Sequence, residues 1–314
     1  MPMNWQKELK RIVKGRVKLN EPLSRHTTFK IGGKAECWFE PKDIGDLKSV
    51  LNFARRNSLP VFTIGAGSNL LVKDKGIKGI VISLNQPFFK KVEAVRGGIK
   101  VGAGLGLDSL VNITQKKGLS GAEFLAGIPG TVGGALLMNA GVRGNCIGIN
   151  RYLNISDTGE SVEVMNYVGK KLTLKKKDLK FSYRFSNLGS YIILAVKLKL
   201  GKADKDKIKN TIEKFRQYKK LYQQWDKPNA GCIFRNPQLV PGYLPLTAGQ
   251  MIDLCGLKGL KRGGAVVSLH HANFILNSGE AKARDVLELM KIVQQRVRQK
   301  FRLELVPEIK IVGC

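Results

Sequence analysis

Two glycine-rich stretches of the sequence could hold an anionic ligand through main-chain groups. The first, VFTIGAGSNLLVKDKG, places Gly65 and Gly67 directly after an expected strand, and the second, GAEFLAGIPGTVGGALLMNAGV, covers residues 121–142. Glycine permits close approach and a positive φ, and exposed N–H groups in such turns bind anions. For the first stretch taken alone, an ordinary tight turn is an equally good interpretation.

The spacing of these glycines does not fit a Rossmann dinucleotide-binding domain. A third glycine would be needed where the chain has Leu70, and Gly76 ends the segment before a helix can follow. Another candidate, VGAGLGLDSL at 101–110, does open a helix, but its glycines are two residues apart throughout. The sequence therefore disfavours a Rossmann domain.

The stretch from Phe124 to Val142 carries no charge, which raises the alternative of a membrane span. A spanning helix needs about 20 apolar residues. Here the run is interrupted by several glycines and by Pro129, and Gly and Pro cost up to ~1 and ~3 kcal/mol relative to Ala inside a helix. We expect no membrane insertion, and interpret the run as a tight, water-poor main-chain surface.

The net charge of +30, from 54 Lys and Arg against 24 Asp and Glu, leaves a nucleic-acid-binding protein as a second alternative. The basic residues are spread along the chain, however, and their densest group, at 169–180, has the alternation of a solvated hairpin. Aromatic residues make up only 7% of the chain, which is little for base stacking. No specific nucleic-acid partner is expected, and a polyanionic small ligand would benefit from the same field.

The cysteines and histidines point to no metal centre. The five cysteines have no C-x-x-C spacing, and the three histidines form no ligand motif. The N-terminal segment has no apolar core of signal-peptide length. We therefore expect no bound metal, reduced thiols and a cytoplasmic location.

Hydrophobic periodicity predicts the elements around the first glycine loop. A helix is expected over 44–57, followed by strands at 61–64 and 79–84. A second helix is expected near 108–117, with Asp108 as its cap.

The composition of the chain changes after residue 200. A polar amphipathic helix is expected from 204, and a long helix is expected over 281–300, followed by a final strand in LVPEIKIVG at 305–313. One apolar stripe of the long helix consists of Val286, Leu289, Met290, Val293 and Val297. The main domain boundary is placed near 204.

Seven motifs, in this order and spacing over about residues 20–313, resemble the UDP-N-acetylenolpyruvoylglucosamine reductase family. They are RHTTFKIGGKA (25–35), IGAGSNLLV (64–72), LAGIPGTVGGALLMNAG (125–141), FSYRFS (181–186), NAGCIFRNP (229–237), AGQMIDLCGLKG (248–259) and LVPEIKIVG (305–313). The short interval between Arg184 and Cys232, with no long tyrosine-bearing insertion, resembles the compact subclass of that family.

The resemblance implies an α+β protein with an FAD-binding fold of the vanillyl-alcohol-oxidase (PCMH) type in two subdomains, plus a C-terminal α+β substrate-binding domain. It places the FAD-binding domain at 1–203, with a subdomain boundary at about 85, and the substrate-binding domain at 204–304. The final strand, 305–314, carries Glu308 and is expected to return to the FAD-binding domain.

The implied activity is reduction of UDP-N-acetylglucosamine enolpyruvate to UDP-N-acetylmuramate for peptidoglycan synthesis. We expect the protein to be a monomer. NADPH is the implied reductant and FAD the cofactor. Hydride arriving at the alkene leaves charge that spreads into the substrate carboxylate, so the site needs a cation there and an acid that protonates carbon.

The resemblance assigns the catalytic roles to three residues. Arg184 matches the arginine that grips the carboxylate, and its planar fork keeps its charge. Cys232 stands where most members have serine as proton donor, and a thiol of pKa ~8.5 gives up a proton more readily than an alcohol. Glu308 matches a glutamate that assists the enol, so we expect it to be protonated or paired with Arg184 during turnover. Without the resemblance, the ordinary interpretations would be a surface arginine, a buried thiol and an ion-paired glutamate.

The implied binding residues lie in the same motifs. The expected cofactor contacts are Gly65, Ala66, Gly67, Ser68, Asn69, Leu70, Gly127, Ile128, Pro129, Gly130, Thr131, Gly133, Gly134, Asn139 and Ala140. The expected substrate contacts are Tyr183, Gly231, Arg235 and Asn236. A related flavin oxidase remains an alternative within the enzymes, and yellow colour would distinguish either flavoprotein from a nucleic-acid binder.

Overall fold

The computed structural model describes residues 5–222, 226–237 and 246–314 of the chain. The chain packs as two compact units. Unit 1 comprises residues 1–19, 37–66 and 79–219, and unit 2 comprises residues 20–36, 67–78 and 220–314.

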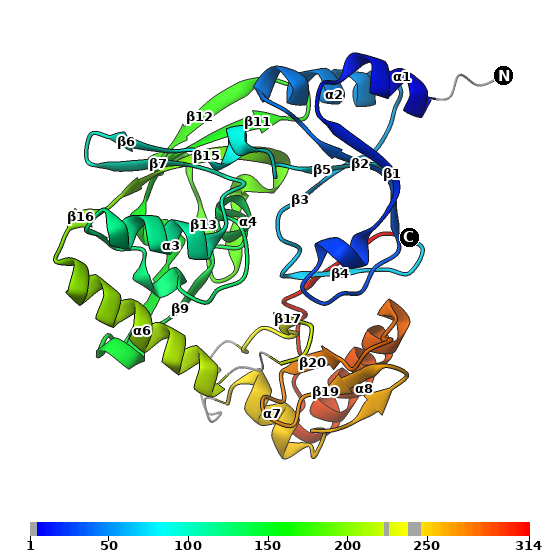
Figure 1. Cartoon of the computed structure of the whole chain (residues 1–314). Helices are drawn as coiled ribbons and strands as arrows, with labels where there is room; N and C mark the ends of the chain where they lie inside the picture. Colours follow the sequence, from blue (N-terminus) through cyan, green and yellow to red (C-terminus); the bar gives the residue numbers. More distant parts are fainter. Residues whose placement is uncertain (1–4, 223–225, 238–245) are drawn as a thin grey trace. The chain divides into compact units, whose positions relative to one another are not determined.

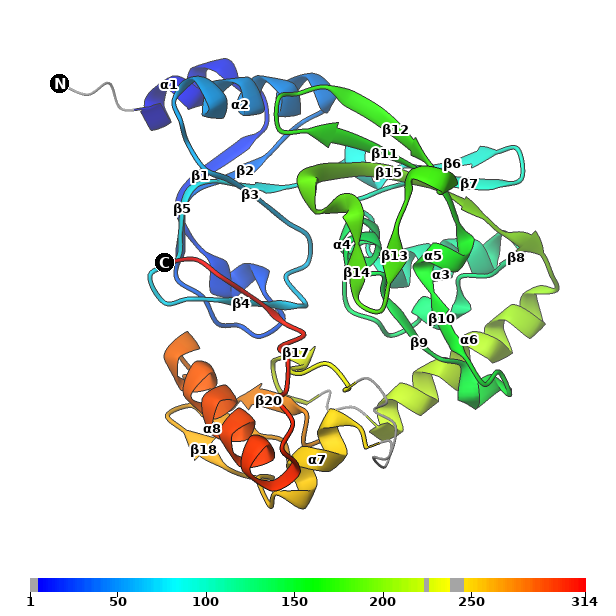
Figure 2. The same ribbon diagram turned by 180° about the vertical axis from the view of Figure 1, so that it is seen from behind.

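Unit 1 is built on a five-stranded antiparallel sheet. Its strand order is β12 (Lys171–Lys175), β11 (Gly159–Asn166), β15 (Tyr191–Lys199), β7 (Gly98–Gly102) and β6 (Val92–Val95). Figures 1 and 2 show three helices on one side of this sheet, namely α3 (Leu107–Lys116), α4 (Val132–Leu137) and α6 (Lys205–Tyr222). The expected alternation at 169–180 is confirmed in β12, but the other arm of its hairpin is β11, which precedes it.

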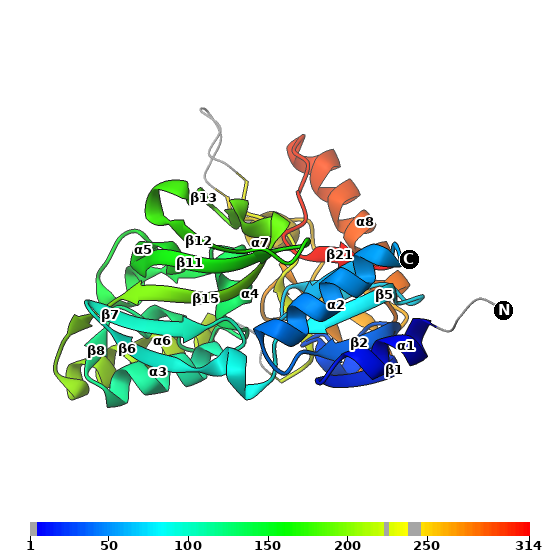
Figure 3. The same cartoon turned by 90° about the horizontal axis from the view of Figure 1, so that it is seen from above.

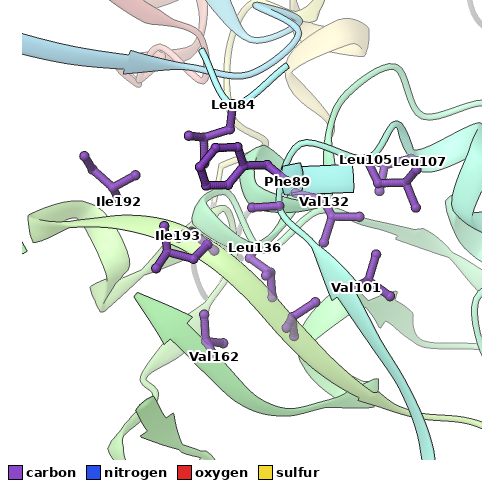
Figure 4. Close-up of a cluster of buried hydrophobic side chains, with 14 of the residues drawn as sticks. Leu84, Phe89, Val101, Leu105, Leu107, Val132, Leu136, Val162, Ile192 and Ile193 are labelled. Atoms are coloured by element: carbon purple, nitrogen blue, oxygen red, sulfur yellow. The ribbon is translucent and has the colours of Figure 1, made fainter. Parts of the chain in front are cut away.

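The core of unit 1 lies between the sheet and these helices. Figure 4 shows Val132 and Leu136 of α4 among Val101 of β7, Ile193 of β15 and Phe89. All five side chains are buried. Apolar contact thus fixes α4, whose first residues belong to the second glycine stretch, on the sheet.

Helices α1 (Trp5–Ile12) and α2 (Ile44–Arg56) lie side by side (Figures 1 and 3). The Asp43 side chain accepts a hydrogen bond from Asp46 N–H and so caps α2. A four-stranded sheet has the order β1 (Arg16–Pro22), β2 (Lys34–Glu40), β5 (Ile77–Ser83) and β3 (Val61–Ile64). The predicted helix at 44–57 and strands at 61–64 and 79–84 are confirmed by α2, β3 and β5.

Short elements complete unit 1. The strand pairs are β8 (Leu119–Ser120) with β16 (Gly201–Lys202), β9 (Gly141–Arg143) with β10 (Tyr152–Asn154), and β13 (Phe181–Ser182) with β14 (Phe185–Ser186). The helical turns are α5 (Ile155–Thr158), η2 (Pro87–Lys90), η3 (Glu123–Leu125), η4 (Gly144–Ile147), η5 (Lys176–Asp178) and η6 (Asn187–Ser190).

Unit 2 contains a four-stranded antiparallel sheet covered by a long helix. The strand order is β17 (Asn229–Cys232), β20 (Phe274–Asn277), β19 (Ala265–Val267) and β18 (Lys261–Arg262). Helix α8 (Ala283–Phe301) packs on β18 and β19 (Figure 2), and the five residues of its predicted apolar stripe are all buried. Unit 2 also holds η1 (Leu23–His26) and α7 (Ala248–Leu254).

The predicted final strand is shorter than expected. Only β21 (Lys310–Val312) forms a regular strand, pairing in parallel with β4 (Leu70–Val72), because Pro307 makes an isolated bridge with Phe234 instead. The predicted division of the chain into binding domains at 203 and 304 stays a prediction, and residues 205–219 of α6 pack with unit 1. In the part of the chain that the structure describes, no helix is long and apolar enough to cross a membrane.

Candidate functional site

In unit 1, the first glycine loop is backed by the start of α4. A Cβ placed on Gly65 would come within 2.5 Å of Thr131 Oγ1, and this hydroxyl caps α4 by accepting from Gly134 N–H at 3.3 Å. Gly65 is therefore required by close packing of the protein itself. Two residues earlier, Thr63 Oγ1 is buried and, among the described residues, has no hydrogen-bond partner.

Gly67, which begins the unit 2 part of this loop, is required for two reasons. Its φ is +62°, in the left-handed region, and a Cβ there would overlap the carbonyl oxygen of His26. Thr28, two residues after His26, carries a second buried hydroxyl whose Oγ1 has no hydrogen-bond partner within the described ranges. Neither Thr28 nor Thr63 was predicted as a site residue, although both stand in or next to the quoted motifs.

The second glycine stretch bends sharply before α4. Gly127 has a φ of +68° and Gly130 a φ of +156°. Gly130 O accepts from Leu107 N–H at 3.0 Å, at the first turn of α3. Gly106 caps that helix, so the predicted cap at Asp108 was wrong: the Asp108 carboxylate instead accepts from Gly127 N–H at 3.2 Å.

The N–H groups at the start of α4 are already engaged within the protein. Gly133 N–H donates to Ala103 O at 2.9 Å, and a Cβ on Gly133 would come within 3.0 Å of the Ala103 Cβ. Gly134 N–H donates to Thr131. Gly133 therefore allows α4 to approach the end of β7, and any cofactor contact made by Gly133 or Gly134 must use another part of the residue.

Arg184 stands at the tip of the β13–β14 hairpin in a strained backbone conformation. Its φ is +55°, which costs an ordinary side chain about 1–2 kcal/mol. The half-buried guanidinium donates from Nη2 to Gly141 O at 3.4 Å and lies 5.0 Å from the centre of the Tyr183 ring. Such strain marks a candidate functional position, because the surrounding structure must enforce it.

Two side chains fasten this hairpin to the end of α4. Asn139, which is 4% exposed, donates from Nδ2 to Ser182 O at 3.0 Å. Ser186, on the other strand of the hairpin, donates from Oγ to Leu137 O at 2.8 Å. The predicted cofactor residue Asn139 thus holds the hairpin that carries Arg184.

Tyr183 continues into a short aromatic array. Its ring meets Tyr152 edge to face at 5.9 Å, and the Arg143 guanidinium lies 5.4 Å from the Tyr152 ring centre. The array links the β13–β14 hairpin to β9 and β10, and it fixes the direction of the Tyr183 ring beside Arg184.

In unit 2, a bulge aims the half-buried Cys232. Gly231 has a φ of +76°, and its N–H donates to Asn229 Oδ1 at 2.9 Å. The pairing of β17 with β20 is irregular between Asn229 and Cys232, where Cys232 stands opposite Phe274. Gly231 therefore supplies the turn that sets the direction of the thiol.

The strand that follows Cys232 is bonded to the segment that carries Glu308. Glu308 N–H donates to Ile233 O at 2.8 Å, and Arg235 N–H donates to Val306 O at 2.9 Å. Glu308 is 9% exposed. The structure thus brings the predicted residues Cys232 and Glu308 onto neighbouring, hydrogen-bonded segments of unit 2.

Asn69 ties the glycine loop to Glu308. Its side-chain Nδ2 donates to Glu308 O at 3.2 Å, and its carbonyl oxygen accepts from Lys310 N–H at 2.9 Å. The sequence predicted a cofactor contact for Asn69, and that assignment stays a prediction. Through these two bonds Asn69 holds the main chain at Glu308 itself and at Lys310, two residues later.

Asn273 is a residue of the site that the sequence did not predict. It is 2% exposed, and its amide bonds both main-chain groups of Phe234, accepting from N–H at 2.9 Å and donating to O at 2.8 Å. Its own carbonyl accepts from Ile233 N–H. Asn273 therefore supplies the hydrogen bonds to Ile233 and Phe234 that a neighbouring strand would otherwise make, directly after β17 ends at Cys232.

The two predicted substrate residues after Phe234 have different surroundings. Asn236 Oδ1 accepts from Ala248 N–H at 3.0 Å, at the start of α7. Arg235 Nε is buried and lacks a hydrogen-bond partner in the described part of the chain. An unmet donor of this kind suits an oxygen-rich ligand.

One buried cation in unit 1 was not expected from the sequence. Lys219 of α6 is 3% exposed, and its Nζ donates to Ala126 O. Burial lowers the pKa of Lys219 to about 7, against the opposing effect of the charge on Asp108. Nearby, burial raises the pKa of the Cys146 thiol.

The residues present fit a bound FAD. The two glycine stretches are held in defined conformations by their own packing, and Thr63 and Thr28 offer buried hydroxyls whose hydrogen bonds a ligand can complete. Neither the loop at 65–70 nor the stretch at 127–140 contains an acidic residue of its own that would repel phosphate oxygens. Main-chain groups and hydroxyls are suitable partners for a diphosphate.

Two family models match the chain. The model described as "FAD binding domain" matches residues 35–175, and that described as "UDP-N-acetylenolpyruvoylglucosamine reductase, C-terminal domain" matches residues 223–312. Together with the mixed helices and antiparallel sheets, the first match confirms the predicted α+β fold with a PCMH-type FAD-binding domain.

Known proteins match nearly the whole chain. The UDP-N-acetylenolpyruvoylglucosamine reductase of Caldanaerobacter subterraneus subsp. tengcongensis is 41% identical over 309 residues, covering 98% of this chain and 97% of the relative. That of Moorella thermoacetica is 40% identical over 307 residues, covering 98% and 96%. The crystal structure of the Thermus caldophilus reductase matches with a TM-score of 0.77 at 36% identity, covering 96% of this chain and 99% of that one.

Proposed function

Since the chain belongs to the UDP-N-acetylenolpyruvoylglucosamine reductase family, we propose that it reduces the enolpyruvyl group of UDP-N-acetylglucosamine enolpyruvate to give UDP-N-acetylmuramate. The cofactor is FAD and the reductant is NADPH. The observation that carries this proposal is the match of almost the entire chain to reductases of this family, with each predicted catalytic residue in a described position.

FAD, when bound, supplies the hydride chemistry between NADPH and the substrate double bond. The chain's part is to hold the cofactor, hold the substrate carboxylate and deliver a proton. The proposed FAD contacts are the loop from Gly65 to Leu70 and the stretch from Gly127 to Ala140. The buried hydroxyls of Thr63 and Thr28 are added to them because each has an unmet hydrogen bond among the described residues.

Arg184 binds the substrate carboxylate in this proposal. Charge grows on the carboxylate oxygens as the alkene accepts hydride, and a guanidinium bonds both oxygens in one plane without losing its own charge. The support lies in the left-handed backbone of Arg184 and the fastening of its hairpin by Asn139 and Ser186. A preorganised cation stabilises the charged transition state without moving during the reaction.

Cys232 delivers the proton to the substrate carbon, and Glu308 assists from the neighbouring segment. Support comes from the bulge at Gly231, which aims the thiol, and from the hydrogen bond between Glu308 and Ile233. The residues that follow Cys232 bond to Asn273 on one side and to the segment of Glu308 on the other, so the main chains that carry the thiol and the carboxyl group are held together. Proton transfer by a positioned side chain contributes about 10²–10⁴-fold to a rate.

Tyr183, Gly231, Arg235 and Asn236 contact the substrate in this proposal. The best supported is Arg235, whose Nε is buried and has no hydrogen-bond partner among the residues that the structure describes, so it suits a phosphate or sugar oxygen. The Tyr183 ring is held by Tyr152 beside Arg184.

NADPH consumption with and without UDP-N-acetylglucosamine enolpyruvate tests the function. The FAD-loaded wild type should oxidise NADPH rapidly only when the substrate is present. Arg184→Ala should lower kcat itself by about 10²–10³-fold, since the lost interaction is one that grows in the transition state. A wild type that takes up no FAD, or an Arg184→Ala variant with unchanged kcat, would overturn the proposal.

A further inference from the structure

One peptide unit at the entry to the second glycine stretch is held from both ends by charged side chains. The carbonyl oxygen of Ala126 accepts from Lys219 Nζ at 2.5 Å. The N–H of the same peptide, on Gly127, donates to Asp108 Oδ1 at 3.2 Å. A single peptide plane is thus fixed by an ammonium group from α6 and a carboxylate from the first turn of α3.

The lysine in this arrangement is in an unusual place. Lys219 is 3% exposed, whereas lysine side chains are almost never fully buried unless paired. Burial lowers its pKa to about 7, while the charges of Asp108 and Cys146 oppose that shift. Keeping a cation here costs stability, so its retention calls for a role beyond packing.

The peptide that Lys219 holds controls the conformation of the next residues in the chain. Gly127 has a φ of +68°, and rotation of the preceding peptide would exchange the directions of its C=O and N–H groups. Residues 128–130 belong to the stretch proposed to hold FAD. At the other end of this turn Gly130 is fixed by Leu107, in the same helix as Asp108.

We propose that Lys219 and Asp108 are positioning residues that clamp the Ala126–Gly127 peptide and thereby preorganise the main chain of residues 128–130 for FAD. This inference rests on the proposed function, because it concerns the cofactor of that same site. The two side chains act through the loop.

The clamp should separate cofactor affinity from protein stability. Replacing Lys219 by methionine keeps an unbranched chain of similar length and removes a buried charge, which leaves the free energy of unfolding of the FAD-free protein unchanged or raised. Loss of the hydrogen bond to Ala126 releases the peptide plane, so FAD must then order the loop itself. A lysine with a merely structural role would show the reverse, with lower stability and unchanged affinity.

In the experiment, the FAD-free protein is titrated with FAD, and binding is monitored through the quenching of flavin fluorescence. The stability of the FAD-free protein is measured separately by urea unfolding. We expect Lys219→Met to raise the FAD Kd about tenfold or more. Asp108→Ala should do the same, and Asp108→Asn should restore part of the affinity because its amide oxygen can still accept from Gly127. Lys214→Met is the matched control, since Lys214 is an exposed lysine of the same helix, and its FAD Kd should stay within about twofold of the wild type.

The outcomes are distinct. Unchanged FAD affinity in Lys219→Met and Asp108→Ala, with normal binding by the wild type, would overturn the clamp and leave the reductase function standing. Equal weakening by Lys214→Met would also overturn it, because the effect would then be one of net charge. A wild type that binds no FAD would overturn the proposed function itself.

Discussion

The two units hold their candidate residues by different means. In unit 1, side chains do much of the holding: Asn139 and Ser186 fasten the hairpin of Arg184, and Lys219 and Asp108 hold the peptide before residue 128. In unit 2, main-chain pairing does most of it, because the residues after Cys232 bond directly to those around Glu308.

The difference predicts how each unit responds to substitution. Main-chain ladders persist when a side chain is changed, so the proposed catalytic residues of unit 2 should be replaceable without loss of the fold. A loop held by a few side chains depends on each of them, so unit 1 should lose function when one is removed. It should lose stability as well, except at Lys219, whose buried charge is itself costly.

The largest effect is expected in unit 2, at Cys232. Cys232→Ala removes the proposed proton donor from a segment that main-chain bonds keep in place, so kcat should fall by about 10²–10⁴-fold with little change in the urea midpoint. Steady-state kinetics and urea unfolding measure the two quantities.

Two further variants test the role of the thiol. Cys232→Ser should keep more activity than Cys232→Ala, because a hydroxyl can also donate. Cys255→Ala is the matched thiol control, since Cys255 is half-buried and burial raises its pKa. Full activity after complete alkylation of Cys232 by iodoacetamide would rule out its role as the donor.

Removing the amide of Asn139 tests the side-chain dependence of unit 1. Asn139→Ala leaves Ser182 O without its buried donor, which should lower the free energy of unfolding by about 1–3 kcal/mol and also lower kcat through Arg184. Urea unfolding and kinetics of the FAD-loaded variant are the measurements.

Asn166→Ala is the matched control for this change. The Asn166 side chain likewise bonds main-chain groups, accepting from Val168 N–H and Lys170 N–H, but it lies in the β11–β12 turn. It should lose some stability and keep its kcat. If both variants lost kcat equally, the claim that Asn139 acts on kcat through the Arg184 hairpin would be wrong.

The elements that the sequence predicted well are those with strong local periodicity. The apolar stripe of α8 and the helix α2 were predicted from residues three or four apart, and both are confirmed. The final strand was predicted too long because nothing local to Pro307 indicates that its partner is Phe234.

The sequence predicts which residues carry the chemistry, an assignment that stays a prediction, but it does not predict the contacts that hold those residues in place. Motifs pointed to Arg184, Cys232 and Glu308, whereas the bonds that hold them join residues far apart in sequence. Asn69 is 239 residues from Glu308, and Lys219 is 93 residues from Ala126. A lysine in a basic amphipathic helix carries no local mark of burial, so such contacts can only be found once the chain is folded.

Asn69 is a side-chain support within unit 2 and should give a smaller effect than the proposed catalytic residues. Asn69→Ala removes the bond to Glu308 O but leaves the pairing of Lys310 with the main chain of residue 69. We expect kcat to fall about tenfold. If Asn69 acts through Glu308, the kcat losses of Asn69→Ala and Glu308→Gln should not add in the double variant.

Ser68→Ala provides the comparison for that cycle. Ser68 is the neighbour of Asn69 in the proposed FAD loop, so Ser68→Ala should raise the FAD Kd. Its loss in kcat should add to the loss caused by Glu308→Gln in the double variant. Additive losses for Asn69→Ala as well would place Asn69 with the cofactor contacts and remove its role in holding Glu308.

The smallest effect is a pH dependence of stability that belongs to unit 1. Folding disfavours the charged form of Lys219, whose pKa is lowered by burial to about 7, from ~10.4 in the unfolded chain. Below pH 7 both states hold the proton and the cost of burying the charge is present in full. As the pH rises above 7, the folded state releases its proton first, so the free energy of unfolding should increase, by at most ~1.4 kcal/mol per pH unit.

Lys219→Met should therefore be more stable than the wild type at pH 6.5, by a margin that shrinks by about 1 kcal/mol at pH 8. Urea unfolding of the FAD-free proteins at the two pH values measures this difference. The range stops below pH 9, because the neighbouring Cys146 thiol, with its raised pKa, acts in the opposite direction there. A margin that is the same at both pH values would mean that Lys219 keeps its proton throughout. The difference between a charged side-chain support in unit 1 and a main-chain support in unit 2 would then have no effect on the pH dependence of stability.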